Sequence, residues 1–451
     1  MESKFSDKYL AMEDRAFKAP DQGSSSDRAS PLNPLQYDET FGRNGKLFIN
    51  MGGRPTSWVS SIVPMHTSSK YLATYYEAGI GGPGGQNNAG LVCFYASGKV
   101  DTSFGTRGDG TVELKLGATD LSFPRHVIEL ENGQLLVVGY HRRMTGVQFM
   151  HVMITRLESD GSVDTSFGDQ GLLNVTALAE RDMLIVGAVS LPDGKIVLLT
   201  IIAEEGPARS LLIKLTADGQ LDETFAGQGI WEFQRSAAKS TLLYGLKLTA
   251  TGSRLLTYGA YPGPAGYSVG FMARFDPDGI LDPDFGQKGF VDIEPEEETV
   301  IHDVSISSDE THLLVSGIHN NRTSVIGDSL LAKHLANGKA DESFNQGEPV
   351  YLQFHPTSIY DIWNDARTLM DGTGKIVVFG YSIKGNEHWS AAGRFHSTGK
   401  PDTKFTGDSS VGSPSNAEFL SRSSYVQGAN PTTILCAGNA EGYAAVLAIK
   451  V

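Results

Sequence analysis

The stretch ESDGSVDTSFGDQG occupies residues 158–171 and returns along the chain in recognisable copies. Close copies are YASGKVDTSFGTRG from Tyr95, TADGQLDETFAGQG from Thr216 and DPDGILDPDFGQKG from Asp276. Looser copies begin at Leu32, Leu335 and His396, and the element common to all of them is Asp-x-x-Phe. A motif that recurs in this way predicts an array of similar structural units rather than a set of unrelated domains.

The spacing of the motif sets the size of the unit. Its aspartates are separated by 63, 63, 58, 60, 59 and 61 residues and are Asp38, Asp101, Asp164, Asp222, Asp282, Asp341 and Asp402. Between motifs lie four runs rich in Val, Ile, Leu and aromatic residues, such as PRHVIEL, GQLLVVGYH and HVMITRLES, each bounded by turn residues. No unit contains a helical pattern of useful length. The sequence therefore predicts an all-β, seven-bladed β-propeller of four-stranded antiparallel blades.

The strand register follows from treating the motif as the start of each unit. Blades are then expected to begin near residues 38, 101, 164, 222, 282, 341 and 402, and the propeller covers 35–451. Nothing before Asp38 resembles a strand, so the first and last blades are expected to close without a strand borrowed from the other terminus. Residues 1–34 are expected to form a short N-terminal arm, in part helical, that docks on the propeller, where it would latch the seam, or on a partner.

The motif itself is expected to be structural. Asp-Gly and Asn-Gly turns provide the positive φ of a tight reversal, the motif aspartate accepts hydrogen bonds from nearby N–H groups, and the phenylalanine fills the wedge between blades. A basic residue lies eight positions before most of the motif aspartates, which predicts ion pairs such as Arg156–Asp164 and Arg274–Asp282. Cys93 takes this position in the first unit.

These features resemble the delta-60 repeat family, whose units carry a Gly-x-Leu-Asp-x-Ser-Phe-Gly motif at this spacing. The resemblance covers about residues 35 to 451. It implies a propeller fold and supplies no catalytic residues, since the functions of the family are mostly undefined.

Composition excludes several classes of function. The 451 residues include 37 Lys and Arg against 52 Asp and Glu, for a net charge of −15, which argues against nucleic acid as a partner. No apolar run approaches the roughly 18–20 residues of a membrane span. The N-terminus lacks the pattern of a classical signal peptide, which favours the cytoplasm or export by a signal-independent route. Cys93 and Cys436 are expected to be free thiols, with a ring-closing disulfide as the alternative.

Three local patterns imitate functional motifs. Gly79, Gly81 and Gly84 have dinucleotide-loop spacing but no helix follows them, and Ser268 in GYSVG lies in an all-β context instead of a nucleophile elbow. The aspartates of DPDGILDPDFG are expected to serve the turn. No cofactor is expected, and a structural calcium ion at these aspartates is the alternative: Asp276, Asp278, Asp282 and Asp284.

Function is expected in the variable loops of one face, because propellers place it there. The polar and aromatic mixture of these loops suits a glycan or a protein surface, and the candidate ligand-binding residues are Tyr140, His141, Arg142, Tyr261, His319, Arg322, His388, Trp389, Tyr360 and Trp363. Loops nearer the axis also carry Arg125, His126, Arg181 and Asp182, and the candidates for an axial metal are His302, Asp303, His355 and Asp361. No catalytic set is fixed by spacing.

The sequence therefore predicts a non-enzymatic binding propeller. Two alternatives are an axial hydrolase or lyase acting on a sugar or lactone, and a subunit of a secreted or toxin-like assembly.

Overall fold

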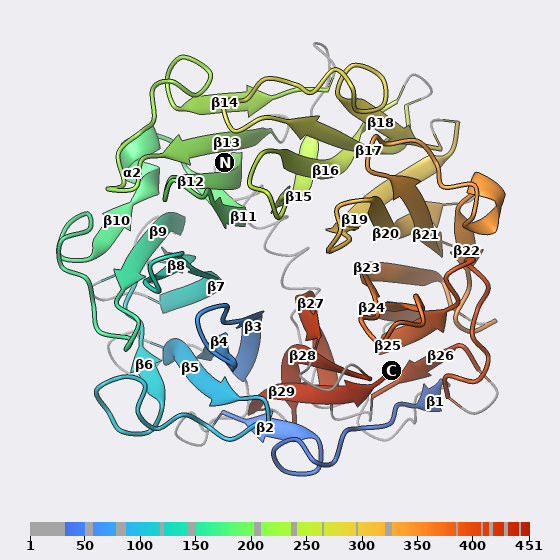
Figure 1. The fold of residues 1–451 in the computed structure, drawn as a ribbon, viewed down its shortest axis with the longest axis horizontal. Coiled ribbons are helices and arrows are strands. Elements are labelled where there is room, and N and C mark those ends of the chain that lie inside the picture. Colours follow the sequence, from blue (N-terminus) through green and yellow to red (C-terminus); the bar gives the residue numbers. More distant parts are fainter. Residues whose placement is uncertain are drawn as a thin grey trace.

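The computed structural model describes most of the chain, namely residues 32–49, 57–77, 87–117, 121–142, 150–202, 209–235, 241–263, 266–294, 296–320, 327–356, 358–384, 387–406, 409–414, 418–427, 432–441 and 443–451. Strands dominate these residues, as their β-branched and aromatic runs predict. Figure 1 shows the sheets arranged radially about a central axis. The prediction of an all-β protein built from four-stranded antiparallel sheets is confirmed.

The strands occupy four radial positions. The innermost are β3 (Ser57–Pro64), β7 (Leu121–Glu129), β11 (Met183–Ser190), β15 (Leu242–Leu248), β19 (Glu298–Ile306), β23 (Tyr360–Thr368) and β27 (Glu418–Gln427). The second are β4 (Lys70–Glu77), β8 (Leu135–Arg142), β12 (Ile196–Ile202), β16 (Leu255–Pro262), β20 (His312–Asn320), β24 (Ile376–Lys384) and β28 (Thr433–Ala440). The third are β5 (Ala89–Tyr95), β9 (Met150–Leu157), β13 (Ser210–Leu215), β17 (Ser268–Phe275), β21 (Gly327–Leu335), β25 (Glu387–Phe395) and β29 (Tyr443–Lys450).

The outermost strands are short. They are β2 (Lys46–Phe48), β6 (Thr111–Glu113), β10 (Leu172–Asn174), β14 (Ile230–Phe233), β18 (Phe290–Ile293), β22 (Val350–Leu352) and β26 (Val411–Ser413). A single parallel bridge between Gly327 and Tyr360 joins the sheet of β19–β22 to that of β23–β26.

The short strand after each motif belongs to the sheet that precedes the motif. β10 pairs with β9, and β14 pairs with β13 in the same manner. The predicted blade starts near residues 38, 101, 164, 222, 282, 341 and 402 are therefore one strand out of register. A periodic sequence fixes the length of a unit but not its first strand, because a ring of four-stranded units can be divided at any of its connections.

The N-terminal part of the chain completes the last sheet. β2 pairs antiparallel with β29, with Lys46 opposite Leu447, and a preceding strand, β1 (Asn33–Pro34), pairs parallel with β26. The predictions that no strand precedes Asp38 and that the ring closes without a borrowed strand are both wrong. Three residues of β2 were too few to stand out as a strand pattern in the sequence. Residues 1–31 of the predicted arm lie outside the described residues.

Each Asp-x-x-Phe motif forms a joint between neighbouring sheets. Oδ1 of Asp164 accepts hydrogen bonds from the backbone N–H and the hydroxyl of Ser166, at 2.9 and 2.6 Å, and Oδ2 accepts from Nε of Arg156 at 2.6 Å. Nη1 of Arg156 reaches the carbonyl oxygen of Ala217 in the next sheet at 2.9 Å, and its guanidinium lies 4.6 Å from the centre of the Phe167 ring. One arginine thus ties the motif to the adjacent unit.

The joint recurs around the ring. The predicted ion pairs Arg156–Asp164 and Arg274–Asp282 are confirmed, at 2.6 and 2.9 Å. Where Cys93 replaces the basic residue, Lys70 on a neighbouring strand binds the motif aspartate Asp101 at 2.6 Å instead. The phenylalanine is buried in every copy: Phe41, Phe104, Phe167, Phe225, Phe285, Phe344 and Phe405. Asp38 joins the last sheet by accepting from the Thr433 hydroxyl at 2.9 Å.

The innermost strands share a β-bulge at one position. Six of them skip a single residue in their pairing with the second strand, and these residues are Ser60, Arg125, Val186, Tyr244, His302 and Asn364. β27 has a wider irregularity between Leu420 and Tyr425. A bulge bends its strand and redirects neighbouring side chains, and here that effect is applied to the strands that border the axis.

Glycines in the second strands make room for the bulges. A Cβ atom on Gly380 would lie 1.7 Å from the carbonyl oxygen of Ile362, beside the bulge of β23. Equivalent contacts of 2.4, 1.9 and 2.1 Å would arise at Gly139, Gly259 and Gly317. The glycine within runs such as GQLLVVGYH is therefore required by close approach of a backbone carbonyl.

A short helix follows one of the outermost strands. The chain turns after Asn174 at the end of β10, and the Asn174 side chain accepts from the N–H of Ala177 at 3.0 Å and caps the five-residue helix α2 (Val175–Ala179). The other short helix is the 3-10 turn η1 (Asn345–Gly347), which follows a motif. Among the described residues no helix is long and apolar enough to cross a membrane.

Candidate functional site

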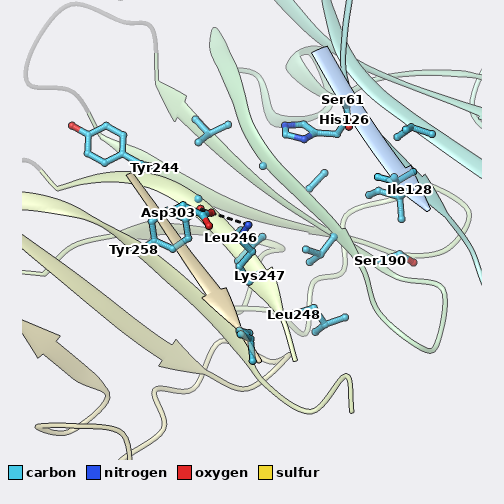
Figure 2. Close-up of a pocket in the computed structure, with 18 of the residues that line it drawn as sticks. Ser61, His126, Ile128, Ser190, Tyr244, Leu246, Lys247, Leu248, Tyr258 and Asp303 are labelled. Carbon is cyan, nitrogen blue, oxygen red and sulfur yellow. Dashed lines mark hydrogen bonds and ion pairs between the residues drawn. The ribbon is translucent and has the colours of Figure 1, made fainter. Parts of the chain in front are cut away.

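The innermost strands β3, β7, β11, β15, β19 and β23 enclose an axial cavity of about 600 Å³. The bulges place side chains of different character on its wall, including Tyr244 of β15 and His302 of β19. Figure 2 shows part of this wall, where Asp303 and Lys247 meet beside Tyr258, and His126 comes from a different strand. The backbone of the inner strands thus recurs from sheet to sheet, while the side chains that these strands present to the cavity differ.

One carboxylate anchors the polar part of the wall. Asp303 Oδ1 accepts from Nζ of Lys247 at 2.8 Å and from the hydroxyl of Tyr258 at 2.7 Å. The carboxyl group is buried, with 9% of its side chain exposed, whereas 30% of the Lys247 side chain is exposed. Lys247 therefore neutralises the aspartate while presenting part of its own surface.

A second ion pair lies next to the first. Nη2 of Arg367 lies 2.8 Å from Oδ2 of Asp365, whose side chain is 3% exposed, and both residues belong to β23. Arg367 borders the axial cavity, and it also borders a second cavity of about 700 Å³ between the sheets of β19–β22 and β23–β26. Two aspartates and two cations from three neighbouring strands thus form one cluster, which we call the axial cluster: Lys247, Asp303, Asp365 and Arg367.

The two carboxyl groups of the axial cluster influence each other. Oδ2 of Asp303 and Oδ1 of Asp365 are buried and have no hydrogen-bond partner, and the negative charge of Asp303 raises the pKa of Asp365. Two buried carboxyl groups that repel in this way favour ionisation of one of them over the other.

The pKa values of the two carboxyl groups move apart. The pKa of Asp365 is raised to about 7: burial raises it most, the charge of Arg367 opposes this, and the adjacent Asp303 carboxylate adds to the rise. Burial also disfavours ionisation of Asp303, but the charges of Lys247 and Arg367, with the hydrogen bonds from Lys247 and Tyr258, lower its pKa overall. Asp365 is therefore the carboxyl group of the pair that retains a proton more readily.

The rest of the described wall includes one more acidic residue, Glu129, whose carboxyl oxygens accept from the backbone N–H of His66 at 2.6 Å and from the Thr67 hydroxyl. Burial and the charge of Arg125 lower the pKa of His126 to about 4, so this imidazole is neutral near pH 7. Ser61, Asn364 and Tyr244 contribute neutral polar groups. These groups suit hydrogen bonding to a small polar molecule.

The rim residues predicted as a binding set are dispersed. Many of them lie at strand ends that share one face, since the second strands end there and the third strands begin there. Within this group Trp363 is fully buried and packs 4.1 Å from Phe354, which excludes it from direct ligand contact. His141 is buried and stacks on His151 at 4.8 Å, and Tyr140 is buried and accepts from Arg125 at 2.9 Å.

Other rim candidates retain exposed surface. Tyr360 is 37% exposed, and Trp389 in β25 is half-buried. Tyr261 donates to Asp292 at 3.2 Å and lies against Arg235, and His319 stacks on Tyr351 at 4.3 Å. Arg322 lies outside the described residues, as does the side chain of His388. None of the rim candidates that the structure describes lines the axial cavity.

The metal candidates do not assemble. His302 and Asp303 lie on β19, whereas His355 precedes β23 and Asp361 begins it, where Asp361 accepts from the N–H of Phe354 at 2.7 Å. Among the described residues, no three or more His, Cys, Asp or Glu side chains are arranged to hold a metal ion.

The aspartates of DPDGILDPDFG are occupied by separate partners. Asp276 accepts from two backbone N–H groups of its turn, Asp278 binds Lys214 at 3.1 Å, and Asp282 binds Arg274 and Arg254. These contacts are those of the turn and the joint.

The remaining motifs either have a structural explanation or lie outside the described residues. Ser268 is the first residue of β17, so GYSVG enters a strand and forms no nucleophile elbow. The glycine run from Gly79 lies outside the described residues. Cys93 and Cys436 are buried free thiols.

Sequence reasoning named His126, His302 and Asp303 but missed Lys247, Tyr258, Asp365 and Arg367. Lys247 is an isolated charged residue in the run YGLKLTA, whereas Asp365 and Arg367 lie in the polar stretch NDART. The signal that identifies them is positional: they lie on or beside a bulged strand, opposite a glycine-containing second strand.

The comparisons with known proteins support the fold. A protein-family model described as "Domain of unknown function (DUF5122) beta-propeller" matches residues 191–225, which span β12, β13 and the motif at Asp222. Together with the radial sheets, this match supports a β-propeller repeat family. No curated protein sequence matches the chain.

Several solved structures resemble the chain weakly. Prolyl oligopeptidase B from Galerina marginata is 12% identical with a TM-score of 0.40, and the match covers 84% of this chain, which spans 46% of that one. The polysaccharide lyase Uly1 is 10% identical with a TM-score of 0.45, over 91% and 92% of the two chains. The GH93 α-L-arabinofuranosidase of Fusarium graminearum is 9% identical with a TM-score of 0.37, over 93% and 96%. Similarities at this level carry no argument about activity.

Proposed function

We propose that this chain is a seven-bladed β-propeller of the delta-60 type that binds a saccharide in its axial cavity. The supporting observation is the cavity itself, about 600 Å³ in volume and lined by polar groups from six inner strands. Pockets of this size commonly hold small molecules, and their few convergent polar groups set the specificity. Seven motif copies and the closure of the last sheet by β2 support the blade number.

The size and axial position of the cavity favour a small glycan over a protein surface. Protein interfaces bury roughly 800 Å² on each partner and are broad, whereas this cavity lies inside the ring formed by the inner strands. Exposed rim residues such as Tyr360 and Trp389 are candidate contacts for a longer glycan that extends beyond the cavity.

The axial cluster favours binding over hydrolysis. Glycoside hydrolases hold two carboxyl groups roughly 5–10 Å apart, with the scissile bond between them. In the axial cluster, Asp303 is engaged by Lys247 and Tyr258. Asp365 also does not border the axial cavity.

A glycan array tests this proposal without assuming the sugar. The intact chain is expected to bind a restricted group of saccharides, and Lys247→Met is expected to weaken that binding. Binding that is lost in Trp389→Ala but unchanged in Lys247→Met would move the site to the rim. A blank array with folded protein would overturn the saccharide proposal.

The assembly alternative makes a different prediction. If the N-terminal arm docks on a partner, deletion of residues 1–31 should abolish partner capture while β1 and β2 remain to close the ring. Unchanged capture and unchanged stability would remove the docking role of the arm.

A further inference from the structure

The second cavity, of about 700 Å³, has a largely apolar wall. Its apolar side chains come from β19, β20, β24, β28 and the turn after β23, and they are Ile306, Leu314, Leu369, Met370, Ile376 and Ile434. Most of them are buried, whereas Met370 is 66% exposed. In the corresponding turn after β7, the residue that follows Leu130 is the charged Glu131. An exposed methionine at the edge of an apolar cavity is typical of a binding surface.

The charged groups of this wall are engaged within the ring. Each has a partner: Lys333 and His312 bind Asp341 at 2.9 and 3.4 Å, Arg367 binds Asp365 at 2.8 Å, and Asp309 accepts from the hydroxyls of Ser307 and Thr311. An occupant of the second cavity therefore gains chiefly by covering apolar surface.

The first described strand starts on the same face of the ring as this cavity. The cavity lies where β19 and β23 end and where β20 and β24 begin, and the chain also passes Ser397 there before it enters β26. Because β1 runs parallel to β26 (Figure 1), Leu32 lies at the end of β1 that points to this face. Leu32 packs against the hydrophobic cluster that includes Leu314 and Ile376 of the cavity wall.

The sequence before Leu32 contains an apolar pattern suited to such a cavity. Phe5, Tyr9 and Met12 are spaced by four and three residues, which is the spacing of the anchors that a helix inserts into an apolar groove. Residues 17–31 connect this pattern to Leu32, and a flexible linker of this length has an average end-to-end distance of about 20 Å. A short tether gives the pattern a high effective concentration beside the cavity, so modest contacts are sufficient for docking.

We propose that residues 1–16 of this chain dock in the second cavity, where Phe5, Tyr9 and Met12 cover its apolar wall and contact Met370. The docked segment holds the sheets of β19–β22 and β23–β26 together. This inference concerns a different cavity from the saccharide proposal and does not depend on it.

Limited trypsin digestion of the full chain tests the docking, because the segment contains Lys4, Lys8 and Arg15. Cleavage follows the population of the undocked form, so Met370→Glu, which places a charge against the apolar segment, should accelerate it about tenfold or more. Ile280→Glu is the matched control, since Ile280 is also 66% exposed but lies outside the second cavity, and it should leave the rate unchanged.

A second variant locates the contact. Tyr9→Ser should release the segment as Met370→Glu does, and the double variant should be cut no faster than the faster single variant, because both changes break the same contact. If Met370→Glu does not fold, hydrogen exchange of residues 368–376 replaces it, and exchange should be slower in the wild type than in Tyr9→Ser.

The other outcomes overturn the proposal. Equal cleavage of the wild type and folded Met370→Glu excludes docking in this cavity, and so does an equal acceleration in Ile280→Glu. Additive acceleration in the double variant, or equal hydrogen exchange in Tyr9→Ser, places the segment elsewhere. Protection that increases with protein concentration assigns the segment to a second copy of the chain instead of its own cavity.

Discussion

The joints between sheets and the wall of the axial cavity both place aspartates next to cations, but the pKa values of the aspartates shift in opposite directions in the two regions. In a joint, Asp164 has donors for both oxygens, and the hydrogen bonds from Ser166 lower its pKa to about 2. In the axial cluster, Asp365 has Arg367 for one oxygen and no hydrogen-bond partner for the other, and burial is the main cause that raises its pKa to about 7. The joint keeps its carboxylate ionised, and the axial cluster keeps one proton.

The residues that repeat hold the sheets together, whereas the residues that vary face the cavity and are suited to setting ligand specificity. Every motif copy repeats the same aspartate and phenylalanine, because each pair of neighbouring sheets needs the same connection. The bulged positions vary from Ser60 to Arg125, Tyr244 and His302, although their backbone geometry recurs. A repeated frame with a varied interior is suited to one specific ligand at the axis.

The largest expected effect concerns the joint. Phe285→Ala removes a fully buried ring from the wedge between two sheets and should lower the free energy of unfolding by about 3–5 kcal/mol. Urea unfolding followed by tryptophan fluorescence measures it. Ile280→Ala is the control, since Ile280 is 66% exposed and should change stability by no more than about 0.5 kcal/mol. Equal effects of the two substitutions would contradict the role of the phenylalanine.

The next largest loss of stability is expected at the glycines that make room for the bulges of the inner strands. Gly380→Ala places a Cβ atom 1.7 Å from the carbonyl oxygen of Ile362, so the strand pair must shift, at an expected cost of about 1–3 kcal/mol. The shift also displaces the bulge before Asp365. Gly187→Ala on β11 is the control, because its nearest neighbour would be 3.5 Å away. If thermal unfolding shows both variants equally stable, the bulge does not require glycine.

A smaller loss in the free energy of unfolding is expected when the charge of one motif aspartate is removed. Asp164→Asn keeps the shape of the side chain but removes the ionic contact with Arg156, which should cost about 1–2 kcal/mol near pH 7. Urea unfolding at neutral pH and again near pH 2 measures the difference. The cost should shrink at low pH, where the wild-type carboxylate is itself protonated. A cost that is independent of pH would point to the geometry of the side chain instead of its charge.

The smallest effect, and the one that separates the two regions most directly, is a pH profile. Carboxyl groups of the joints have pKa values lowered to about 2, so their stabilisation is present above the unfolded pKa of about 4 and is lost as the pH falls towards 2. Asp365 has the opposite sign: its contribution is complete below about pH 4 and is lost as the pH rises through about 7.

Asp365→Asn isolates that second contribution. The amide cannot ionise, so the difference in unfolding free energy between the variant and the wild type should be smallest at about pH 4 and should grow in favour of the variant up to about pH 8. Urea unfolding midpoints across this range measure the difference. A wild-type profile that is flat from pH 5 to 8 would show that Asp365 does not retain a proton.

The sequence predicted the joints well because their chemistry is local and repeated. A basic residue lies eight positions before the motif aspartate in most units, as Arg156 does before Asp164. The ion pair could therefore be predicted from the spacing alone. The predicted strand register was wrong because a periodic sequence does not show which strand comes first in each sheet. The strand β2 was missed because its three residues are too few to show that they complete the last sheet. The axial cluster depends on residues more than one unit apart, such as Lys247 and Arg367, and only the ring brings them together.

The borrowed strand has a kinetic consequence. β2 is synthesised early, but its partner β29 lies near the other end of the described chain, and the contact between Asp38 and Thr433 spans 395 residues. The last sheet cannot be completed until β29 has left the ribosome, and contacts of such sequence separation form slowly. Until then both strands present unpaired edges that invite pairing with other chains. Ring closure is therefore the step at which this protein is most exposed to chaperones, or to a second copy of itself.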